Sequence, residues 1–288
     1  MKYNKFLVPP GKKIKLNRYD PDFCGEFKTK EEAQEKLTAD IRAMAGMQEV
    51  LYAQDTYALL LIFQAMDAAG KDGIIKHIMS GINPQGCQVH SFKAPSQEEL
   101  DHDYLWRTMK ALPERGRIGI FNRSYYEEVL IVRVHPEILA GQRFPRQGKK
   151  DRNLWNNRYE DINSVERYLS RNGIVILKFF LNISKNEQKK RFLERIDQPE
   201  KNWKFSFADI QEREHWDEYM EAYEEMLNAT STPWAPWHVI PANKKWVTRV
   251  VTAGIVLNTL KSLNLQYPEI SESRKRELLK ARKSLEQK

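Results

Sequence analysis

Short, almost purely apolar runs that alternate with helical patterns constrain the fold of this chain most strongly. Residues 57–63 and 174–181 form the two clearest runs, and shorter ones lie at 88–92, 117–121 and 237–241. A strand that is apolar on both faces is typical of a parallel sheet covered by helices on both sides. Because helical patterns lie between the runs, we expect an α/β domain around a parallel sheet.

The expected helices follow from apolar spacing and from capping residues. Thr29 followed by Glu32 forms a capping box, which opens a helix that runs to about Asp55. Ser96 followed by Glu99 predicts a second start of the same kind. The expected helices cover residues 29–55, 73–82, 96–112, 125–134, 151–171, 184–196, 207–228 and 244–264, with a charged helix after residue 271.

Composition narrows the class of protein. Apolar residues make up 41% of the 288 residues, which is enough for a large core and excludes a mainly disordered chain. No apolar run approaches the roughly 18 residues that cross a bilayer, and the first residues lack the apolar stretch of a signal peptide. Cys24 and Cys87 are the only cysteines, which excludes a disulfide framework or a cysteine-based zinc site and favours a cytoplasmic location.

No repeat or linker divides the chain, so we expect one domain with extensions at both ends. Residues 1–28 are expected to form an extended arm, 29–268 the domain, and 269–288 a charged C-terminal helix. A basic stretch within residues 143–152 is expected to be an exposed loop. The net charge of +8 indicates an anionic partner, but it does not separate nucleic acid, membrane surface and phosphorylated substrate.

A turn rich in glycine and alanine, between the first strand and the next helix, carries the main chemical signal. It matches the P-loop pattern GxxxxGK[ST] imperfectly, because Ala65 replaces the first glycine and Asp72 replaces the Ser/Thr. Backbone N–H groups of such a turn can cradle phosphate oxygens, and Lys71 adds a mobile positive charge. The alternative is an ordinary helix start, capped by Asp67, with a solvated lysine. The candidate phosphate-binding residues are Ala68, Ala69, Gly70, Lys71, Asp72 and Gly73.

Carboxylates beside this turn indicate a cation. Asp67 is electrostatically unfavourable next to bound phosphate unless a cation intervenes, so Asp67 and Asp72 can bind Mg²⁺ directly or through water. Alternatively, Asp67 can accept a hydrogen bond from an attacking phosphate. Asn122 follows the third strand, where P-loop proteins commonly carry a metal-holding Asp, which puts metal binding by Asn122 in doubt.

Basic side chains beyond the turn suit phosphoryl oxygens. Arg123 follows the third strand and Arg133 comes ten residues later, with surface ion pairs as the alternative for both. The segment 184–205 is strongly basic, and Arg191 and Arg195 share one helix face there. A mobile basic helix would close over substrate and exclude water, and the alternative is an ordinary solvated helix. The six histidines lack metal-ligand spacing and are interpreted as structural or surface residues.

Long segments of the chain resemble the family-2 polyphosphate kinases and follow the order of that family. They are FQAMDAAGKDGIIKHI, SFKAPSQEELDHDYLWR, IGIFNRSYYEEVLIVRVHP, ILKFFLNISKNEQKKRFLERI, NWKF and STPWAPWHVIPANKKW, within roughly residues 5–268. The resemblance implies a P-loop kinase fold related to thymidylate and adenylate kinases. That fold is a three-layer α/β sandwich with a five-stranded parallel sheet and a helical lid, here at about residues 184–206.

The resemblance also implies a reaction and roles for residues. The reaction is reversible phosphoryl transfer between inorganic polyphosphate and nucleotides with Mg²⁺, or Mn²⁺ in its place. By motif, Asp67 and Lys71 are the central loop residues, and Arg123 and Arg133 bind phosphate. Asn122 and Arg123 belong to the nucleotide and phosphate site. The lid residues that the motif implies are Arg191, Arg195 and Lys204.

The acceptor subgroup is indicated by the segment RSYYEEVLIV. Members that make ATP from ADP typically show RSWYNRAGVE there, so Glu127 in place of the amide resembles class III, which takes AMP through ADP to ATP. Asp67 and Glu127 are then the candidate catalytic and metal-holding carboxylates. A dimer or tetramer is expected by resemblance, and no membrane or specific nucleic-acid partner is expected. Two rival functions stay open: an ATP-dependent nucleoside monophosphate kinase, and a non-enzymatic basic domain that binds nucleic acid.

Overall fold

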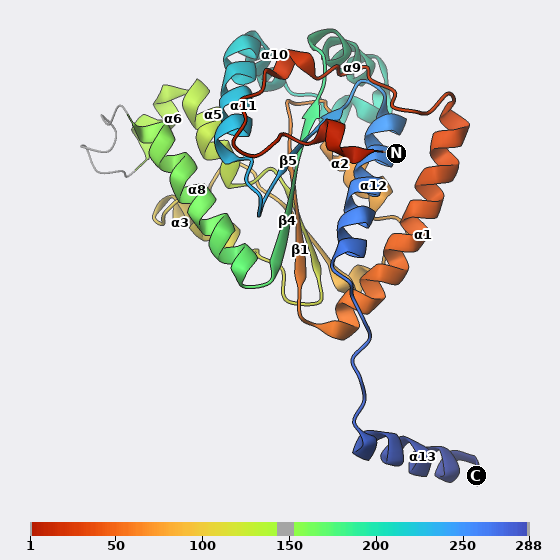
Figure 1. Cartoon of the computed structure of the whole chain (residues 1–288). Helices are drawn as coiled ribbons and strands as arrows, with labels where there is room; N and C mark the ends of the chain where they lie inside the picture. The colour runs from red at the N-terminus through yellow and green to blue at the C-terminus, as the bar shows by residue number, and fades with distance from the viewer. Residues whose placement is uncertain (1, 143–152, 287–288) are drawn as a thin grey trace.

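A five-stranded parallel sheet forms the centre of the computed structural model, which describes residues 2–142 and 153–286 (Figure 1). The strands lie in the order β2-β3-β1-β4-β5 and confirm the expected ones, with ends shifted by at most one residue. All seven residues of β1 are buried, as an apolar central strand requires. The strands are β1 (Ala58–Gln64), β2 (Cys87–Ser91), β3 (Ile118–Asn122), β4 (Ile174–Asn182) and β5 (Trp237–Pro241).

The register of the sheet brings the ends of β1 and β3 together. Phe63 pairs with Asn122 on one side and with Phe179 of β4 on the other. In a parallel sheet the carboxyl ends of all strands meet at one edge, and ligands bind in the crevice outside that edge. The turn after β1 and the residues after β3 therefore face the same space.

Helices cover both faces of the sheet and make a three-layer sandwich (Figure 1). The helices α1, α2 and α12 pack together on one face, while α8 and α11 pack together on the other. The helices α9 and α10, with η5 between them, lie over the carboxyl edge, and α9 and η5 fall within the predicted lid. The bounds of these helices are α1 (Lys30–Gln54), α2 (Lys71–Ile78), α8 (Leu154–Arg171), α9 (Lys185–Asp197), η5 (Pro199–Lys204), α10 (Phe207–Glu214), α11 (Trp216–Thr230) and α12 (Lys245–Ser262).

The helix expected over residues 96–112 is interrupted. Ser96 and Glu99 do form a reciprocal capping box, but the helix it opens is only one turn long. Asp103 Oδ1 then accepts a hydrogen bond from the backbone N–H of Leu105 at 2.9 Å. Such a local side-chain bond competes with the helical pattern, so the segment divides into α3 (Gln97–Leu100) and α4 (Trp106–Met109).

Two further expected helices are also divided. Ser124 Oγ accepts a hydrogen bond from the N–H of Tyr126, which starts a tight 3₁₀ turn in place of an α-helix. His215 separates α10 from α11, because its N–H bonds to Glu212 O three residues back. The remaining short elements are η1 (Tyr3–Phe6), η2 (Leu16–Arg18), η3 (Pro84–Gly86), η4 (Tyr125–Val129), α5 (Ile131–Val134) and α6 (Pro136–Gly141).

The N-terminal residues are packed onto the domain. Phe6, Val8 and Leu16 are buried, and burying these apolar side chains is what holds the segment against the body. Leu7 bridges His238 of β5 in antiparallel fashion, so the segment also covers the outer edge of the sheet.

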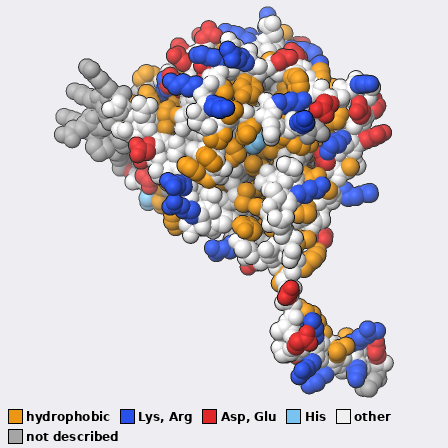
Figure 2. Space-filling model, in the orientation of Figure 1, with side chains coloured by type: hydrophobic (Ala, Val, Ile, Leu, Met, Phe, Trp, Pro, Cys, Tyr) orange, Lys and Arg blue, Asp and Glu red, His pale blue; other side chains and the backbone are white. Residues whose placement is uncertain are grey.

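The C-terminal helix α13 (Glu272–Glu286) stands clear of the body and none of its residues is buried (Figure 1). Figure 2 shows exposed apolar and basic side chains on it together. No helix within the described ranges is both long and apolar enough to cross a membrane. The basic stretch within residues 143–152, expected to be an exposed loop, lies outside the described residues. The division into arm, domain and tail stays a prediction.

Candidate active site

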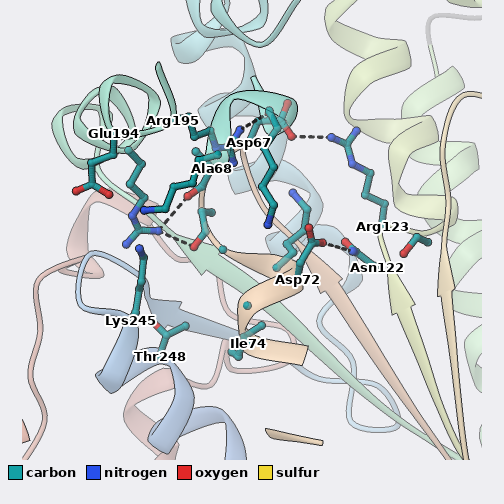
Figure 3. Close-up of a pocket in the computed structure, with 18 of the residues that line it drawn as sticks. Asp67, Ala68, Asp72, Ile74, Asn122, Arg123, Glu194, Arg195, Lys245 and Thr248 are labelled. Carbon is teal, nitrogen blue, oxygen red and sulfur yellow. Dashed lines mark hydrogen bonds and ion pairs between the residues drawn. The ribbon is translucent and has the colours of Figure 1, made fainter. Parts of the chain in front are cut away.

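A cavity of about 570 Å³ opens at the carboxyl edge of the sheet, between the turn after β1, the lid and the start of α12 (Figure 3). Its wall carries nine basic side chains against three carboxylates, so it presents strong positive charge to any ligand. The basic residues are Lys71, Lys93, Arg123, Arg191, Arg195, Lys201, Lys204, Lys245 and Arg249. The carboxylates are Asp67, Asp72 and Glu194.

The turn between β1 and α2, residues 65–70, is here called the phosphate loop. Ala68 has φ 61° and Gly70 has φ 104°, so two of its residues lie in the left-handed region. Such a backbone costs a non-glycine residue about 1–3 kcal/mol and must be held by its surroundings. Gly70 directly precedes α2, which begins at Lys71, two residues earlier than expected. The N-terminal N–H groups of α2 therefore lie at the loop, where they suit an anion.

Lys71 is buried under the phosphate loop and is 9% exposed. Its Nζ donates to Ala65 O at 2.8 Å and to Met66 O at 3.4 Å. Burial, and after it the charge of Arg123, lowers the pKa of Lys71 to about 8. An anion in the cavity would favour the charged lysine, so this group is poised to respond to a phosphate ligand.

Arg123 joins the two candidate metal carboxylates. It follows β3 with φ 64°, another left-handed residue at the site. Its Nη2 lies 2.6 Å from Asp67 Oδ1, a pair drawn in Figure 3. Its Nη1 lies 3.6 Å from Glu127 Oε2. Glu127, opposed by burial and supported by Asp67, raises the pKa of Arg123, which therefore keeps its charge. Gln64 Nε2 donates to Glu127 Oε1 at 2.9 Å and fixes that carboxylate.

Asp67 and Glu127 fit a divalent cation only in part. Both carboxylates contact one guanidinium, Asp67 at Nη2 and Glu127 at Nη1, and of the two only Asp67 lines the cavity. The described residues contain no group of three or more His, Cys, Asp or Glu that could hold a metal ion. Mg²⁺ prefers oxygen ligands and commonly takes one or two carboxylates plus phosphate oxygens and water. The donor set therefore fits a cation that arrives with phosphate.

The side chains of Asp72 and Asn122 form a hydrogen bond with each other. Asn122 Nδ2 donates to Asp72 Oδ1 at 2.7 Å, as Figure 3 shows. This contact ties the end of β3 to the first turn of α2 and leaves Asp72 engaged. Both residues line the cavity, as expected for the phosphate site.

Arg133 does not line the cavity. It donates to Tyr159 Oη at 3.2 Å and pairs with Glu225 of α11. These partners lie on α8 and α11. The predicted phosphate-binding and catalytic roles of Arg133 stay predictions.

The three lid residues all line the cavity but differ in their contacts. Arg195 donates to Lys204 O and to Asp209, both at 3.2 Å. Arg191 is only 5% exposed and bonds to backbone carbonyls of the phosphate loop instead of pointing freely into the cavity. The first half of α9 is therefore anchored to the domain.

Other cavity residues were not predicted from the sequence. Lys93 follows β2, and Lys245 and Arg249 lie one turn apart at the start of α12. Burial, and after it the charge of Arg191, lowers the pKa of Lys245. The i,i+4 spacing of two basic residues directly after a strand end was the available signal. Gln188 was also missed, because a neutral residue within a basic helix carries no pattern of its own.

Residues 27–268 match the model of the protein family described as Polyphosphate kinase 2 (PPK2). The chain belongs to the PPK2 family. A PPK2 relative from Rhodopseudomonas palustris, named ADP-polyphosphate phosphotransferase, is 51% identical over 285 residues, 99% of each chain. Another from Meiothermus ruber, named AMP/ADP-polyphosphate phosphotransferase, is 45% identical over 266 residues, 92% of this chain and 95% of its own.

A solved PPK2 structure is also similar. The crystal structure of polyphosphate kinase 2 from Arthrobacter aurescens TC1 superposes with a TM-score of 0.86 at 41% identity, over 96% of this chain and 95% of that one. The family and the P-loop kinase fold with its five-stranded parallel sheet are thereby confirmed.

Proposed function

We propose that the protein transfers phosphoryl groups reversibly between inorganic polyphosphate and nucleoside mono- and diphosphates. The observation that carries the proposal is the nine-cation cavity that opens onto the phosphate loop. One transferred phosphate would need only the loop, Lys71 and Arg123. The remaining basic wall suits a polyanionic donor that extends beyond the reacting group. The names of the relatives from Rhodopseudomonas palustris and Meiothermus ruber support this assignment.

The chemistry asks the protein mainly for positioning and charge neutralisation. Lys71 and the N-terminal N–H groups of α2 would bind oxygens of the transferred phosphate, and Arg123 would stabilise the charge that develops on it. Lys245 and Arg249 on one wall and Lys201 and Lys204 on the other would hold the rest of the donor chain. The lid would exclude water, which protects the phosphoryl group from hydrolysis.

Mg²⁺ is part of the proposal, with Mn²⁺ as a substitute. Asp67 and Glu127 would hold it, together with phosphate oxygens and water. The cation would supply neutralisation of phosphate charge when bound. The same two carboxylates contact Arg123, at 2.6 Å and 3.6 Å, and so orient this guanidinium beside the phosphate loop.

AMP and ADP are both proposed as acceptors, as in class III of the family. Glu127 is held by Gln64 at 2.9 Å and faces Arg123, which places a fixed carboxylate next to the reacting region. Glu127→Ala should lower the rate with AMP more than the rate with ADP. Equal loss with both acceptors would contradict a selective role for this carboxylate.

The deciding experiment is nucleotide conversion with AMP, long-chain polyphosphate and Mg²⁺, followed by chromatography. ADP first and ATP after it, only when polyphosphate is present, is the expected result, and Lys71→Ala should abolish both. Turnover with ATP and AMP alone would favour an ATP-dependent nucleoside monophosphate kinase. A nucleic-acid-binding domain would be favoured by two results together. The protein would show no turnover in any condition, and single-stranded DNA would displace bound polyphosphate.

A homo-oligomer, dimer or tetramer, and a cytoplasmic location complete the proposal. The oligomer rests on the family and the location on the two unpaired cysteines. Light scattering of the purified protein would give the oligomeric state.

A further inference from the structure

Five consecutive carbonyl groups of the phosphate loop accept hydrogen bonds from side chains. Lys71 binds the first two, those of residues 65 and 66. Gln188 and Arg191, one helical turn apart on α9, bind the other three. Gln188 Nε2 donates to Asp67 O at 3.0 Å, and Arg191 Nη1 donates to Ala68 O at 3.0 Å and Ala69 O at 2.8 Å. These partners are more than 120 residues away in the chain, so only the folded domain brings them together.

Arg191 has no N–H left for a phosphate. A guanidinium has five N–H donors. Two of them bind the loop, and Nη2 donates to Ala242 O at 2.6 Å and Asn243 O at 3.0 Å. Nε donates to Glu187 Oε1 at 2.9 Å. The side chain therefore acts as a clamp between the phosphate loop and the turn that precedes α12.

Gln188 joins the loop to the lid through its two amide atoms. It is 1% exposed and does not line the cavity. While its Nε2 binds Asp67 O, its Oε1 accepts a hydrogen bond from Arg213 Nη1 of α10 at 2.7 Å. A neutral, buried amide thus links α10 to the backbone of Asp67.

The clamped residues include the strained part of the loop. Ala68 has φ 61°, a conformation that its own side chain disfavours. Because the carbonyl and the next N–H of a peptide plane point in opposite directions, fixing these carbonyls also fixes the direction of the N–H groups that follow them. One of these, the N–H of Ala69, donates to Met66 O at 3.3 Å within the loop. The phosphate loop therefore keeps its shape before any anion is present.

We propose that Gln188 and Arg191 are positioning residues that hold the phosphate loop ready for phosphate, and that the first half of α9 is a fixed support of the loop. The moving part of the lid then begins after Arg191. This inference rests on the proposed function only for its activity measurement, because the shape of the loop can be followed without substrate.

The test compares Gln188→Glu and Arg191→Lys with Lys189→Ala, an exposed neighbour on α9 that serves as the control. Gln188→Glu keeps the acceptor for Arg213 and loses only the donor to Asp67 O. Arg191→Lys keeps the positive charge but removes the guanidinium group, which bonds to both the phosphate loop and the turn before α12. Hydrogen exchange of residues 65–73 is measured in the enzyme without ligands, with kcat and Tm alongside. Gln188→Ala is a second variant in case the glutamate repels Asp67.

Gln188→Glu should speed amide exchange of the loop about 5- to 10-fold, the effect of one lost hydrogen bond. Gln188→Ala and Arg191→Lys lose more than one bond and should speed it at least as much. We expect kcat to fall about 10- to 100-fold, because misplaced groups lose catalytic alignment. Tm should stay close to that of the control.

Normal loop exchange in both Gln188 variants would overturn the proposal. So would an Arg191→Lys enzyme with normal exchange and kcat but a raised KM for polyphosphate, since that result marks a direct phosphate ligand. An inactive wild-type enzyme with the expected exchange changes would refute the proposed function and leave the clamp standing.

Discussion

Lys71 and Lys178 are two buried lysines with the same perturbation and different surroundings. Burial is the main cause in both, and it lowers each pKa to about 8. Lys178 Nζ, on β4, donates to Glu166 Oε2 at 2.6 Å, to Tyr126 Oη at 2.7 Å and to Thr230 O at 2.7 Å. All three of its donors are thus used inside the core, where it is 0% exposed.

Lys71 has a donor to spare and a cavity beside it. Two backbone carbonyls accept from its Nζ, and no third acceptor is found among the described residues. It lines the basic cavity, whereas Lys178 does not. A lowered pKa therefore does not by itself mark a functional lysine. The free donor and the open space distinguish the group that binds ligand from the group that binds the core.

The largest effect is expected from Lys178→Ala. This change leaves the fully buried Glu166 carboxylate without its cation, which should lower the free energy of unfolding by about 3–5 kcal/mol. Urea unfolding followed by tryptophan fluorescence measures it. A loss below about 1 kcal/mol would show that the two lysines do not differ as described.

Lys71→Met should have the opposite effect to Lys178→Ala: a large loss of activity and little change in stability. Its kcat should fall about 10²–10³-fold, because one preorganised positive donor at the transferred phosphate is removed. The unfolding free energy should change little, or rise slightly, since a depressed lysine is unfavourable in the folded state. Steady-state kinetics and urea unfolding on one preparation give both values. Equal stability losses in Lys71→Met and Lys178→Ala would contradict the comparison.

A double replacement tests whether Lys178 and Glu166 contribute to stability as a pair. Lys178→Met combined with Glu166→Gln removes both charges, so it should recover at least about 2 kcal/mol relative to Lys178→Ala. Tyr125 and Tyr126, which donate to Glu166 at 2.8 Å and 2.7 Å, keep an acceptor in the glutamine. Unfolding curves of the double variant and of each single change test this. Strict additivity of the two single changes would show that the ion pair is not one unit.

The smallest effect is a proton taken up when phosphate binds. Free Lys71, with a pKa of about 8, is partly neutral at pH 8.5, and a bound anion raises that pKa. Binding of polyphosphate should therefore take up a fraction of a proton, up to about one, and affinity should weaken as pH rises above 8. Calorimetry in two buffers with different ionisation enthalpies measures the uptake. Lys71→Met should abolish it, while Lys189→Ala should not.

The pH dependence of stability has the same sign for both lysines. Between pH 8 and about 10.5 the unfolded chain holds protons that the folded protein has released. The contribution of each lysine to stability therefore rises with pH in that window. Saturating polyphosphate should remove the contribution of Lys71 alone, because only that lysine meets the ligand.

The central sheet and the phosphate loop could be predicted because their signals are local. Residues 58–64 are apolar at every position but the last, and this pattern is typical of a strand buried on both faces. Gly70 followed by Lys71, between a strand and a helix, indicates an anion site from neighbouring residues only. Asp67 and Arg123 were singled out from the loop and the end of the third strand, while Glu127 came from the resemblance to the family.

Other expectations depended on contacts that no local pattern contains. Arg191 was assigned to a mobile lid from its basic neighbours, but its partners in the loop lie more than 120 residues away. Arg133 was expected near phosphate from its motif, and its contacts with Tyr159 and Glu225 come from helices distant in the chain. Lys178 stands within an apparently apolar run, and Glu166, its partner, looks like one more charge on a polar helix.

The sequence by itself determined the layered α/β architecture and the place of the phosphate loop, because strand periodicity and turn chemistry act over a few residues. Only the tertiary structure decided which charged residues meet ligand, which clamp the loop and which are sealed in the core. The physical reason is that the fate of a charged side chain depends on the dielectric and the donors around it. Those surroundings exist only after the helices have docked on the sheet.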